Sequence, residues 1–462
     1  MDMNAHDTLR VDPGKTAAFY SVLHRAKGGV RGMNWKEIYR EKIVTADEAM
    51  QHIQRGDLII PGDFGAEPVY LMEHMTKRAG ALGNVKVMHG GNIGPEPHLM
   101  SESKEFVDFE CLCAVPISRK ALEERRADFV PCYFHEWPKL FKTVKKPDVA
   151  LIQVTEPDEN GMVSLGVSSD FTSLIPTLAR TTIAQVNRNM PFIPSNTISI
   201  EQLDYLVLQD EPLLLLTDSF PGEVEKEIAR HVIPLIHDGD CLQIGRGKLP
   251  DYVMTQLMDK KDLGIHTEMF SDGAMQLVKA GVINNSRKSF HPGKTVCSFM
   301  AGSEELYKWA QDNEDLLLLP VDIVNDPFII AQNDNVVSLN SAIEVDLLGQ
   351  AVADMIGSRQ FTGVGGFTDF VRGAGRSKGG RSILAFASTS KDGKTSRIVP
   401  HITEGAAVAA TRYDTNYVVT EYGAAQLWGK TNRERVEALI GIAHPKFRDE
   451  LRAYAHEKGL IW

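Results

Sequence analysis

The sequence predicts an α/β protein built from two tandem, duplicated open α/β domains, and three observations carry this prediction. The chain has 462 residues, which is more than a single ordinary hydrophobic core organises. Short β-rich runs alternate with longer helical patterns, which is typical of largely parallel sheets with helices on both faces. A pattern of turns and strands in the first half then recurs in the second half, which indicates duplication of one domain.

The elements of the first half follow an N-terminal extension, residues 1–32, which contains no apolar core of the kind found in signal peptides. A first α/β domain is expected over residues 33–220, with a helix over 46–55. Its strands are expected at residues 57–61, 85–89, 148–154 and 205–209. The apolar run 212–217 is short enough to form one more buried strand.

The second half begins after the turn-forming sequence Asp218-Ser-Phe-Pro-Gly222, which predicts the boundary between the domains. A second α/β domain is expected over residues 221–462, and it opens with a helix over 223–231. Three pairs of segments repeat in the same order, with offsets of 183, 181 and 174 residues: 56–62 with 239–245, 82–83 with 263–264, and 163–165 with 337–339.

Glu268 is the clearest candidate for chemistry, and it lies in the segment His266-Thr-Glu-Met-Phe-Ser-Asp-Gly273. On the offset of 181 residues its counterpart in the first domain is Val87, so only one copy carries a carboxylate. Ligands of open α/β sheets bind beyond the carboxyl ends of the strands, and the Ser-Asp-Gly turn marks such an end. We therefore expect Glu268 at a binding site; the simpler alternative is an exposed glutamate at the end of a strand.

Two glycine-rich loops are candidates for holding a ligand near that carboxylate. Gly363-Val-Gly365-Gly366 offers backbone amides that a phosphate or an oxyanion can approach closely, with a tight turn as the alternative. Gly245-Arg246-Gly247-Lys248 combines an open backbone with two cations. Its counterpart in the first half is the segment 62–67, which contains Gly65 and Glu67.

Composition excludes several classes of partner. The net charge of −11 argues against nucleic acid or an anionic membrane, because both bind basic surfaces. Local donors must then bind any anionic ligand, and the basic stretch with Lys378, Lys394 and Arg397 either meets ligand phosphates or forms a solvated hairpin. No apolar run reaches the ~18 residues of a membrane helix. Five irregularly spaced cysteines predict a reducing, cytoplasmic location, and no His/Cys cluster predicts a metal site.

A series of ordered motifs makes the sequence similar to a known family. The most specific are SLNSAIEVDLLGQ (338–350), GVGGFTDFVRGA (363–374), SRIVP (396–400), YVVTEYG (417–423) and IAHPKFR (442–448). From about Met33 to Trp462 the chain resembles the family I CoA-transferases, in the branch of 4-hydroxybutyrate CoA-transferases and acetyl-CoA hydrolase/transferases.

This resemblance implies the CoA-transferase fold, with an active site in the cleft between its two domains. It implies that Glu268 is the nucleophile that attacks the acyl-CoA thioester, that Gly365 or Gly366 donates an amide to an oxyanion, and that Asn340 contacts CoA or the reacting carbonyl. The further residues expected beside CoA are Gly363, Gly366, Lys378 and Lys394. Glu344, a second carboxylate in these motifs, is interpreted as structural support.

One loop departs from the family pattern. Relatives usually carry a neutral Gly-Ile-Gly loop where this chain has Gly245-Arg246-Gly247. In one interpretation these cations face solvent. In the other, Arg246 binds the far carboxylate of a dicarboxylic acid such as succinate or itaconate, and Glu67 and Gly65 border the same pocket.

The expected activity is an acyl-CoA:carboxylate CoA-transferase that acts on small carboxylic acids by a ping-pong mechanism through a glutamyl anhydride and a glutamyl-CoA thioester. A glutamate of ordinary pKa, ~4.3, is ionised at neutral pH and needs no general base. Coenzyme A is expected as a transiently covalent substrate, without a metal or redox cofactor, in a homo-oligomer (dimer or tetramer). The alternatives are a dicarboxylate CoA-transferase, an acyl-CoA hydrolase and, at greater distance, a sugar-phosphate isomerase or a non-catalytic effector-binding protein.

Overall fold

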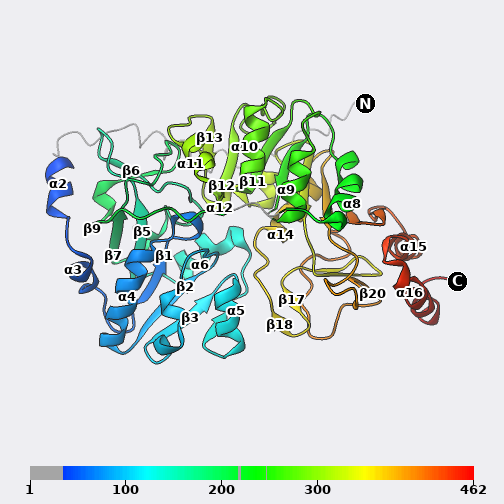
Figure 1. Cartoon of the computed structure of the whole chain (residues 1–462), viewed down its shortest axis with the longest axis horizontal. Helices are drawn as coiled ribbons and strands as arrows, with labels where there is room; N and C mark the ends of the chain where they lie inside the picture. Colours follow the sequence, from blue (N-terminus) through cyan, green and yellow to red (C-terminus); the bar gives the residue numbers. More distant parts are fainter. Residues whose placement is uncertain (1–34, 217–219, 246) are drawn as a thin grey trace, which may run out of the picture.

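The computed structural model of the protein describes residues 35–216, 220–245 and 247–462. Within these residues two large sheets lie side by side, one in each half of the chain (Figure 1). The prediction of two tandem open α/β domains is confirmed. The N-terminal extension predicted for residues 1–32 lies outside the described residues, as does Arg246.

The first sheet has seven parallel strands in the order β4-β3-β2-β1-β5-β7-β9. These strands are β1 (Leu58–Pro61), β2 (Val85–His89), β3 (Val107–Cys111), β4 (Ala127–Phe129), β5 (Val149–Val154), β7 (Thr181–Val186) and β9 (Tyr205–Leu208). The helices of this half are α2 (Trp35–Glu41), α3 (Ala46–Met50), α4 (Val69–Leu82), α5 (Pro116–Glu123), α6 (Trp137–Thr143) and α7 (Ile175–Leu178). A separate antiparallel pair joins β6 (Met162–Ser164) to β8 (Thr197–Ser199).

The second sheet has eight strands in the order β13-β12-β11-β10-β14-β19-β21-β22, and only the β21–β22 pair is antiparallel. These strands are β10 (Cys241–Ile244), β11 (Gly264–Phe270), β12 (Thr295–Met300), β13 (Leu316–Leu318), β14 (Val336–Asn340), β19 (Arg381–Ala385), β21 (Tyr417–Thr420) and β22 (Gly423–Gln426). Short strands outside it are β15 (Glu344–Asp346), β16 (Ala351–Val352), β17 (Met355–Ile356), β18 (Arg359–Gln360) and β20 (Ile398–Val399). The helices are α8 (Glu223–Val232), α9 (Lys248–Thr255), α10 (Asp272–Lys279), α11 (Glu304–Ala310), α12 (Val321–Val324), α13 (Pro327–Ile330), α14 (Phe367–Arg376), α15 (Asn432–Ile442) and α16 (Pro445–Glu457).

The two sheets repeat one strand order, so that β1 corresponds to β10, β2 to β11 and β5 to β14. The first predicted match covers β1 and β10, and the second lies just before β2 and at the start of β11, but the third is wrong. Residues 163–164 belong to β6, which pairs with β8 outside the large sheets, whereas residues 337–339 belong to β14 in the centre of the second sheet. A three-residue apolar match carries too little information to separate a peripheral strand from a central one.

The counterpart of Glu268 also differs from the prediction. In the first sheet Leu58 pairs with Lys86, and in the second sheet Cys241, which matches Leu58, pairs with Gly264. Counting along each strand from these pairs brings Glu268 opposite Gly90, not Val87. The length of the connection before the strand differs between the copies, so a sequence offset taken before the strand does not hold within it. The first copy therefore has a glycine at the position of the carboxylate.

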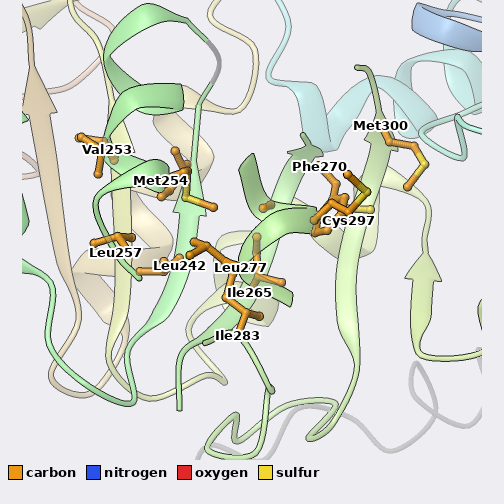
Figure 2. Packing of buried hydrophobic residues seen from close by; sticks show 14 of the residues in the cluster. Leu242, Val253, Met254, Leu257, Ile265, Phe270, Leu277, Ile283, Cys297 and Met300 are labelled. Atoms are coloured by element: carbon orange, nitrogen blue, oxygen red, sulfur yellow. The ribbon is translucent and has the colours of Figure 1, made fainter. Parts of the chain in front are cut away.

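Buried apolar side chains hold the second sheet against its helices. Figure 2 shows Leu242 of β10 and Ile265 of β11 near Leu277 of α10, and Cys297 of β12 beside Phe270. Every residue of β12 is buried, as expected for a parallel strand that is covered on both faces. This packing fixes the strand ends that carry the polar residues described below.

Most expected elements are present, with two differences. The helix predicted over 46–55 begins with a capping box between Thr45 and Glu48 but ends at Met50, where the chain turns toward β1. The run 212–217 is not a strand over its described part, because residues 212–216 find no ladder partner, and Leu215 is 45% exposed. This segment connects β9 to α8 instead. None of the helices in the described ranges has the length and hydropathy needed to cross a membrane.

Candidate active site

Glu268 lies near the carboxyl end of β11, and its side chain is half-buried. It borders two adjoining pockets, one of about 550 Å³ and one of about 360 Å³. Residues of the second half line most of the larger pocket, whereas both halves line the smaller one. Asn340, Gly366 and Cys113 also border both pockets. Glu268 is thus placed where a molecule in either pocket can reach it.

Two hydrogen-bond donors converge on the Glu268 carboxylate. The Nδ2 atom of Asn325, which follows α12, donates to Oε2 over 2.6 Å. The backbone amide of Gly366, which precedes α14, donates to the same carboxylate. A Cβ atom on Gly366 would lie 2.0 Å from Oε2, so only glycine allows this approach. Gly365 meets a different need, because its φ of +51° favours glycine in the backbone itself.

The ionisation of Glu268 differs from the expectation of an ordinary glutamate. Burial raises its pKa to about 7, and the charge of Asp369 acts in the same direction, while the hydrogen bonds from Asn325 and Gly366 oppose the rise. The protein therefore holds this carboxylate close to its midpoint at neutral pH. A higher pKa also makes the carboxylate a stronger base and a better nucleophile once it is ionised.

Asn340, at the end of β14, forms a reciprocal amide pair with Gln243 on β10. Nδ2 of Asn340 donates to Oε1 of Gln243 over 2.9 Å, and Nε2 of Gln243 donates to Oδ1 of Asn340 over 3.3 Å. Both side chains border the smaller pocket. The pair occurs because β10 and β14 are neighbours and their carboxyl ends meet at the same edge of the sheet.

The two pockets differ in their chemistry. The larger one is bordered by Lys248 and by Arg397, whose Nε donates to the carbonyl of Ile343 over 2.8 Å. Burial lowers the pKa of Arg397 to about 10, so it remains a cation at neutral pH. The smaller pocket is bordered mainly by apolar side chains, and Glu268 is the sole charged residue among its described lining residues. Phe64 of the first half stacks on Phe299 of the second half there, with ring centroids 3.7 Å apart.

Comparison with known proteins identifies the fold and the family. The N-terminal domain of acetyl-CoA hydrolase/transferase matches residues 29–216, and the C-terminal domain of the same family matches residues 302–455. The chain is 45% identical over 421 residues to the 4-hydroxybutyrate coenzyme A transferase of Clostridium kluyveri, covering 91% of this chain and 98% of that one. The chain belongs to the acetyl-CoA hydrolase/transferase family. It is accordingly an enzyme of the CoA-transferase type.

Other members of the family support the same assignment. The succinyl-CoA:cyclohexane-1-carboxylate CoA transferase of Geobacter metallireducens is 40% identical over 430 residues, which cover 93% of this chain and 98% of that protein. The crystal structure of RipA from Yersinia pestis superimposes with a TM-score of 0.88 at 36% identity, over 93% of this chain and all of that chain. The similarity to these proteins therefore extends over both domains of the chain.

The structure brings most of the predicted site residues of this family member together. Glu268, Asn340, Gly245, Gly247, Gly363, Gly365 and Gly366 all border the larger pocket. Gly363 also packs tightly on the first half, because a Cβ atom there would lie 2.7 Å from the carbonyl oxygen of Leu112. Glu344 borders neither pocket; its carboxylate accepts hydrogen bonds from the amide and hydroxyl of Thr403, each 2.7 Å long.

Four predicted residues do not reach the pockets. Lys378 lies before β19, at the amino ends of the strands and so at the opposite edge of the sheet, with its side chain 88% exposed. Lys394 is an exposed residue whose Nζ lies 3.9 Å from a carboxylate oxygen of Asp392. Glu67 is buried and accepts hydrogen bonds from Asn92 Nδ2 (2.7 Å) and the Gly94 amide (3.1 Å). Gly65 is buried too, and a Cβ atom there would lie 2.9 Å from Val167.

Three polar residues near Glu268 were not among the candidates from the sequence: Asn325, Gln243 and Asp369. Asn325 lies in a short Asn-Asp-Pro turn, and nothing in that local pattern distinguishes it from an ordinary helix cap. Arg397 was a candidate from the sequence as part of the basic stretch, and it borders the larger pocket, whereas Lys378 and Lys394 do not. No group of three or more His, Cys, Asp or Glu side chains suited to a metal occurs within the described ranges.

Proposed function

We propose that Glu268 carries coenzyme A between carboxylic acids in a ping-pong reaction. The observation that supports this most directly is the position of its carboxylate, half-buried at the junction of two pockets and held by Asn325 and Gly366. A nucleophile needs access to substrate on one side and fixed donors on the other, and Glu268 has both.

The chemical steps follow from that arrangement. The ionised carboxylate attacks the acyl-CoA carbonyl, the C–S bond breaks, and a glutamyl-acyl anhydride and the CoA thiolate form. The thiolate then attacks the glutamyl carbonyl of the anhydride, so that a glutamyl-CoA thioester forms and the first acid leaves as its carboxylate. An acceptor carboxylate repeats these steps in reverse. Neither a redox step nor an added base is needed, because the carboxylate that leaves balances the one that attacks.

Asn325 and Gly366 stabilise the oxyanion that forms when the glutamyl carbonyl becomes tetrahedral. Both already donate to the Glu268 carboxylate in the free enzyme, so little reorganisation is needed as charge develops on that oxygen. Loss of one such donor typically costs ~3 kcal/mol of transition-state stabilisation. This assignment replaces Asn340 by Asn325 as the side-chain donor nearest the reacting carbon.

Each of the two pockets is assigned to a different part of the acyl-CoA substrate. We assign the larger pocket to coenzyme A, because Lys248 and Arg397 supply cations for its phosphates or amide carbonyls. We assign the smaller, largely apolar pocket to the acyl group, with the Asn340–Gln243 amide pair as partner for a hydroxyl. A short monocarboxylic acid such as 4-hydroxybutyrate or butyrate fits this lining better than a dicarboxylate. The dicarboxylate alternative depends on Arg246, which lies outside the described residues.

Covalent trapping tests the nucleophile. The enzyme is incubated with acetyl-CoA alone, treated with borohydride and digested, and the modified peptide is expected to carry its label on Glu268. The Glu268→Gln variant is expected to lose transfer by at least about a thousandfold, because an amide does not form the anhydride. Glu344→Gln is the matched control, and it is expected to retain turnover and labelling. Label on another residue, or normal turnover of Glu268→Gln, contradicts the proposal.

Hydrolysis is the competing outcome in this family. A panel of acids is assayed with acetyl-CoA and succinyl-CoA as donors, while free thiol and new acyl-CoA are measured in parallel. A transferase releases thiol only transiently and forms one new thioester for each one consumed, whereas a hydrolase releases thiol without an acceptor. We further propose that the enzyme acts in the cytoplasm as a homo-oligomer; its five cysteines are all free, in agreement with a reducing compartment.

A further inference from the structure

The amide nitrogen of Asn325 lies between two carboxylates. One of its N–H groups donates to Oε2 of Glu268 over 2.6 Å, and the side chain also forms a hydrogen bond with Asp369 of α14. An asparagine between two acceptors must present its nitrogen, and not its oxygen, to both. Asp369 therefore fixes which end of the Asn325 amide faces Glu268. Among the described residues the Oδ1 atom of Asn325 has no hydrogen-bond partner, which leaves the carboxylates as the groups that orient the amide.

Asp369 is in turn held by a residue of the other half of the chain. His135, in the short helix Phe134–Glu136, approaches Asp369 with Nδ1 2.7 Å from Oδ1, and its backbone amide donates to Oδ2 over 3.2 Å. Asp369 is only 1% exposed, so its charge is not screened by solvent. Asn325 follows α12, and Asp369 lies in α14. Both helices lie near the middle of the molecule, where the two halves meet (Figure 1).

The charged groups in this series of contacts have opposite effects on the ionisation of Glu268. The carboxylate of Asp369 disfavours the ionised form of Glu268, and a proton on His135 offsets that carboxylate. Burial alone would lower the pKa of His135, but Asp369, Glu136 and Asp326 raise it above its ordinary value. Arg372 faces the same region through the ring of Tyr133, which stacks on His135.

We infer that His135 and Asp369 are positioning residues which act through Asn325 to hold Glu268 in its reactive orientation and to set the charge around it. The contact between the two halves of the molecule thereby affects the orientation and the charge environment of the Glu268 carboxylate. This inference rests on the proposed role of Glu268 as nucleophile. Neither His135 nor Asp369 borders either pocket, so their effect passes through Asn325 and not through contact with substrate.

Two substitutions distinguish a positioning role of these residues from a purely structural one. They change the charge near Glu268 in opposite directions, which a general loss of stability would not do. Asp369→Asn removes a negative charge, so the pKa of Glu268 falls and the acid limb of the reaction moves to lower pH. It also frees the Asn325 amide to turn, so the rate on the plateau falls about ten- to a hundredfold. His135→Gln keeps a hydrogen-bonding group but loses the positive charge, so the acid limb moves to higher pH. Each shift is expected to be roughly one pH unit, the size of a single charge acting through an effective dielectric of ~20.

The experiment measures the first burst of acetate released from acetyl-CoA, one per active site, in the absence of acceptor, from mildly acidic to mildly alkaline pH. Wild type, Asp369→Asn and His135→Gln are compared with Asp240→Asn, which makes the same change at a buried aspartate at the amino end of β10, paired with Arg381. Melting temperatures are recorded for all four proteins. We expect opposite displacements of the acid limb in the first two variants and none in Asp240→Asn.

A uniform loss of burst amplitude with an unmoved acid limb overturns the inference, as do shifts of the same sign. If Asp369→Asn does not fold, the displacement in His135→Gln decides alone, since its side chain is 24% exposed and tolerates replacement more easily. Absence of a burst in wild type, together with absence of label on Glu268, removes the proposed function and this inference with it. A normal burst in wild type, with the acid limb of the pH profile unmoved in both variants, contradicts only this inference and not the proposed function.

Discussion

At the scale of single residues, Glu268, the proposed nucleophile, is expected to lower the stability of the folded protein. Its carboxylate is partly withdrawn from water and receives two hydrogen bonds, and burial prevails, so its pKa rises to about 7. A group held this way is unfavourable for folding whenever it is charged. The ordinary glutamate assumed from the sequence would be ionised without such a penalty, but it would also be a weaker nucleophile.

Stability should therefore depend on pH through Glu268, and the sign follows from its raised pKa. Below pH about 4.5 the carboxyl is protonated in both the folded and the unfolded chain. Between about 4.5 and about 7 the unfolded chain ionises while the folded protein keeps its proton, so the free energy of unfolding falls as pH rises. Above pH 7 the full penalty, roughly 2 kcal/mol for a half-buried group, is present.

The Glu268→Gln variant removes this titration. We expect it to melt at a higher temperature than wild type at pH 8 and close to the wild-type temperature at pH 5, with the difference growing through neutrality. Differential scanning calorimetry across this range measures it, with Glu344→Gln as the control. A constant difference at every pH would mean that Glu268 is ionised in the folded protein throughout.

At the scale of an element, the Gly363–Gly366 loop and the first turn of α14 act together. The loop delivers the Gly366 amide to Glu268, and the helix behind it carries Asp369, three residues further on. The two adjacent positions require glycine for different reasons. Gly365 adopts a φ of +51°, which favours glycine, whereas Gly366 has a φ of −84° that any residue tolerates. Only the close approach to Glu268 and Asn325 restricts Gly366.

Alanine at each glycine should separate chemistry from stability. Gly366→Ala places a Cβ atom against Glu268 and Asn325, so transfer should fall by about a hundredfold or more while the melting temperature changes little. Gly365→Ala places its Cβ atom 3.9 Å from Glu268, an ordinary contact, so it should lose roughly 1–2 kcal/mol of stability from left-handed backbone strain. Steady-state kinetics and calorimetry on both variants test this. Equal losses of activity would refute the separate roles.

At the scale of the whole molecule, the site depends on contact between the two halves. His135 of the first half reaches Asp369 of the second, and Phe64 stacks on Phe299 across the smaller pocket. Each domain has its own sheet, but neither domain alone lines the whole smaller pocket. The width of that pocket is consequently a property of how the halves pack.

Phe64→Ala should widen the smaller pocket. We expect the kcat/KM of a bulky acid such as cyclohexane-1-carboxylate to rise by roughly tenfold relative to acetate, since apolar pockets discriminate by volume. Stability should fall by roughly 2–3 kcal/mol because a packed ring is lost. Phe134→Ala is the matched control, as Phe134 packs edge-on to Phe64 without bordering either pocket. A similar change in acid preference in both variants would show that packing, and not pocket shape, is responsible.

The sequence by itself determined the class of fold, the duplication and the candidate nucleophile. Alternating apolar runs and glycine turns are local, so four strands of the first sheet were predicted to within a residue at each end, and the segments with Glu268 and Gly366 could be found as linear patterns. The tertiary structure alone decided which other polar residues meet them. Asn325 and Asp369 lie far from Glu268 in the chain, and the ladder register, not a sequence offset, makes Gly90 its counterpart. Burial, and with it the pKa of about 7, exists only once both halves are packed, because it is the removal of water by residues distant in sequence.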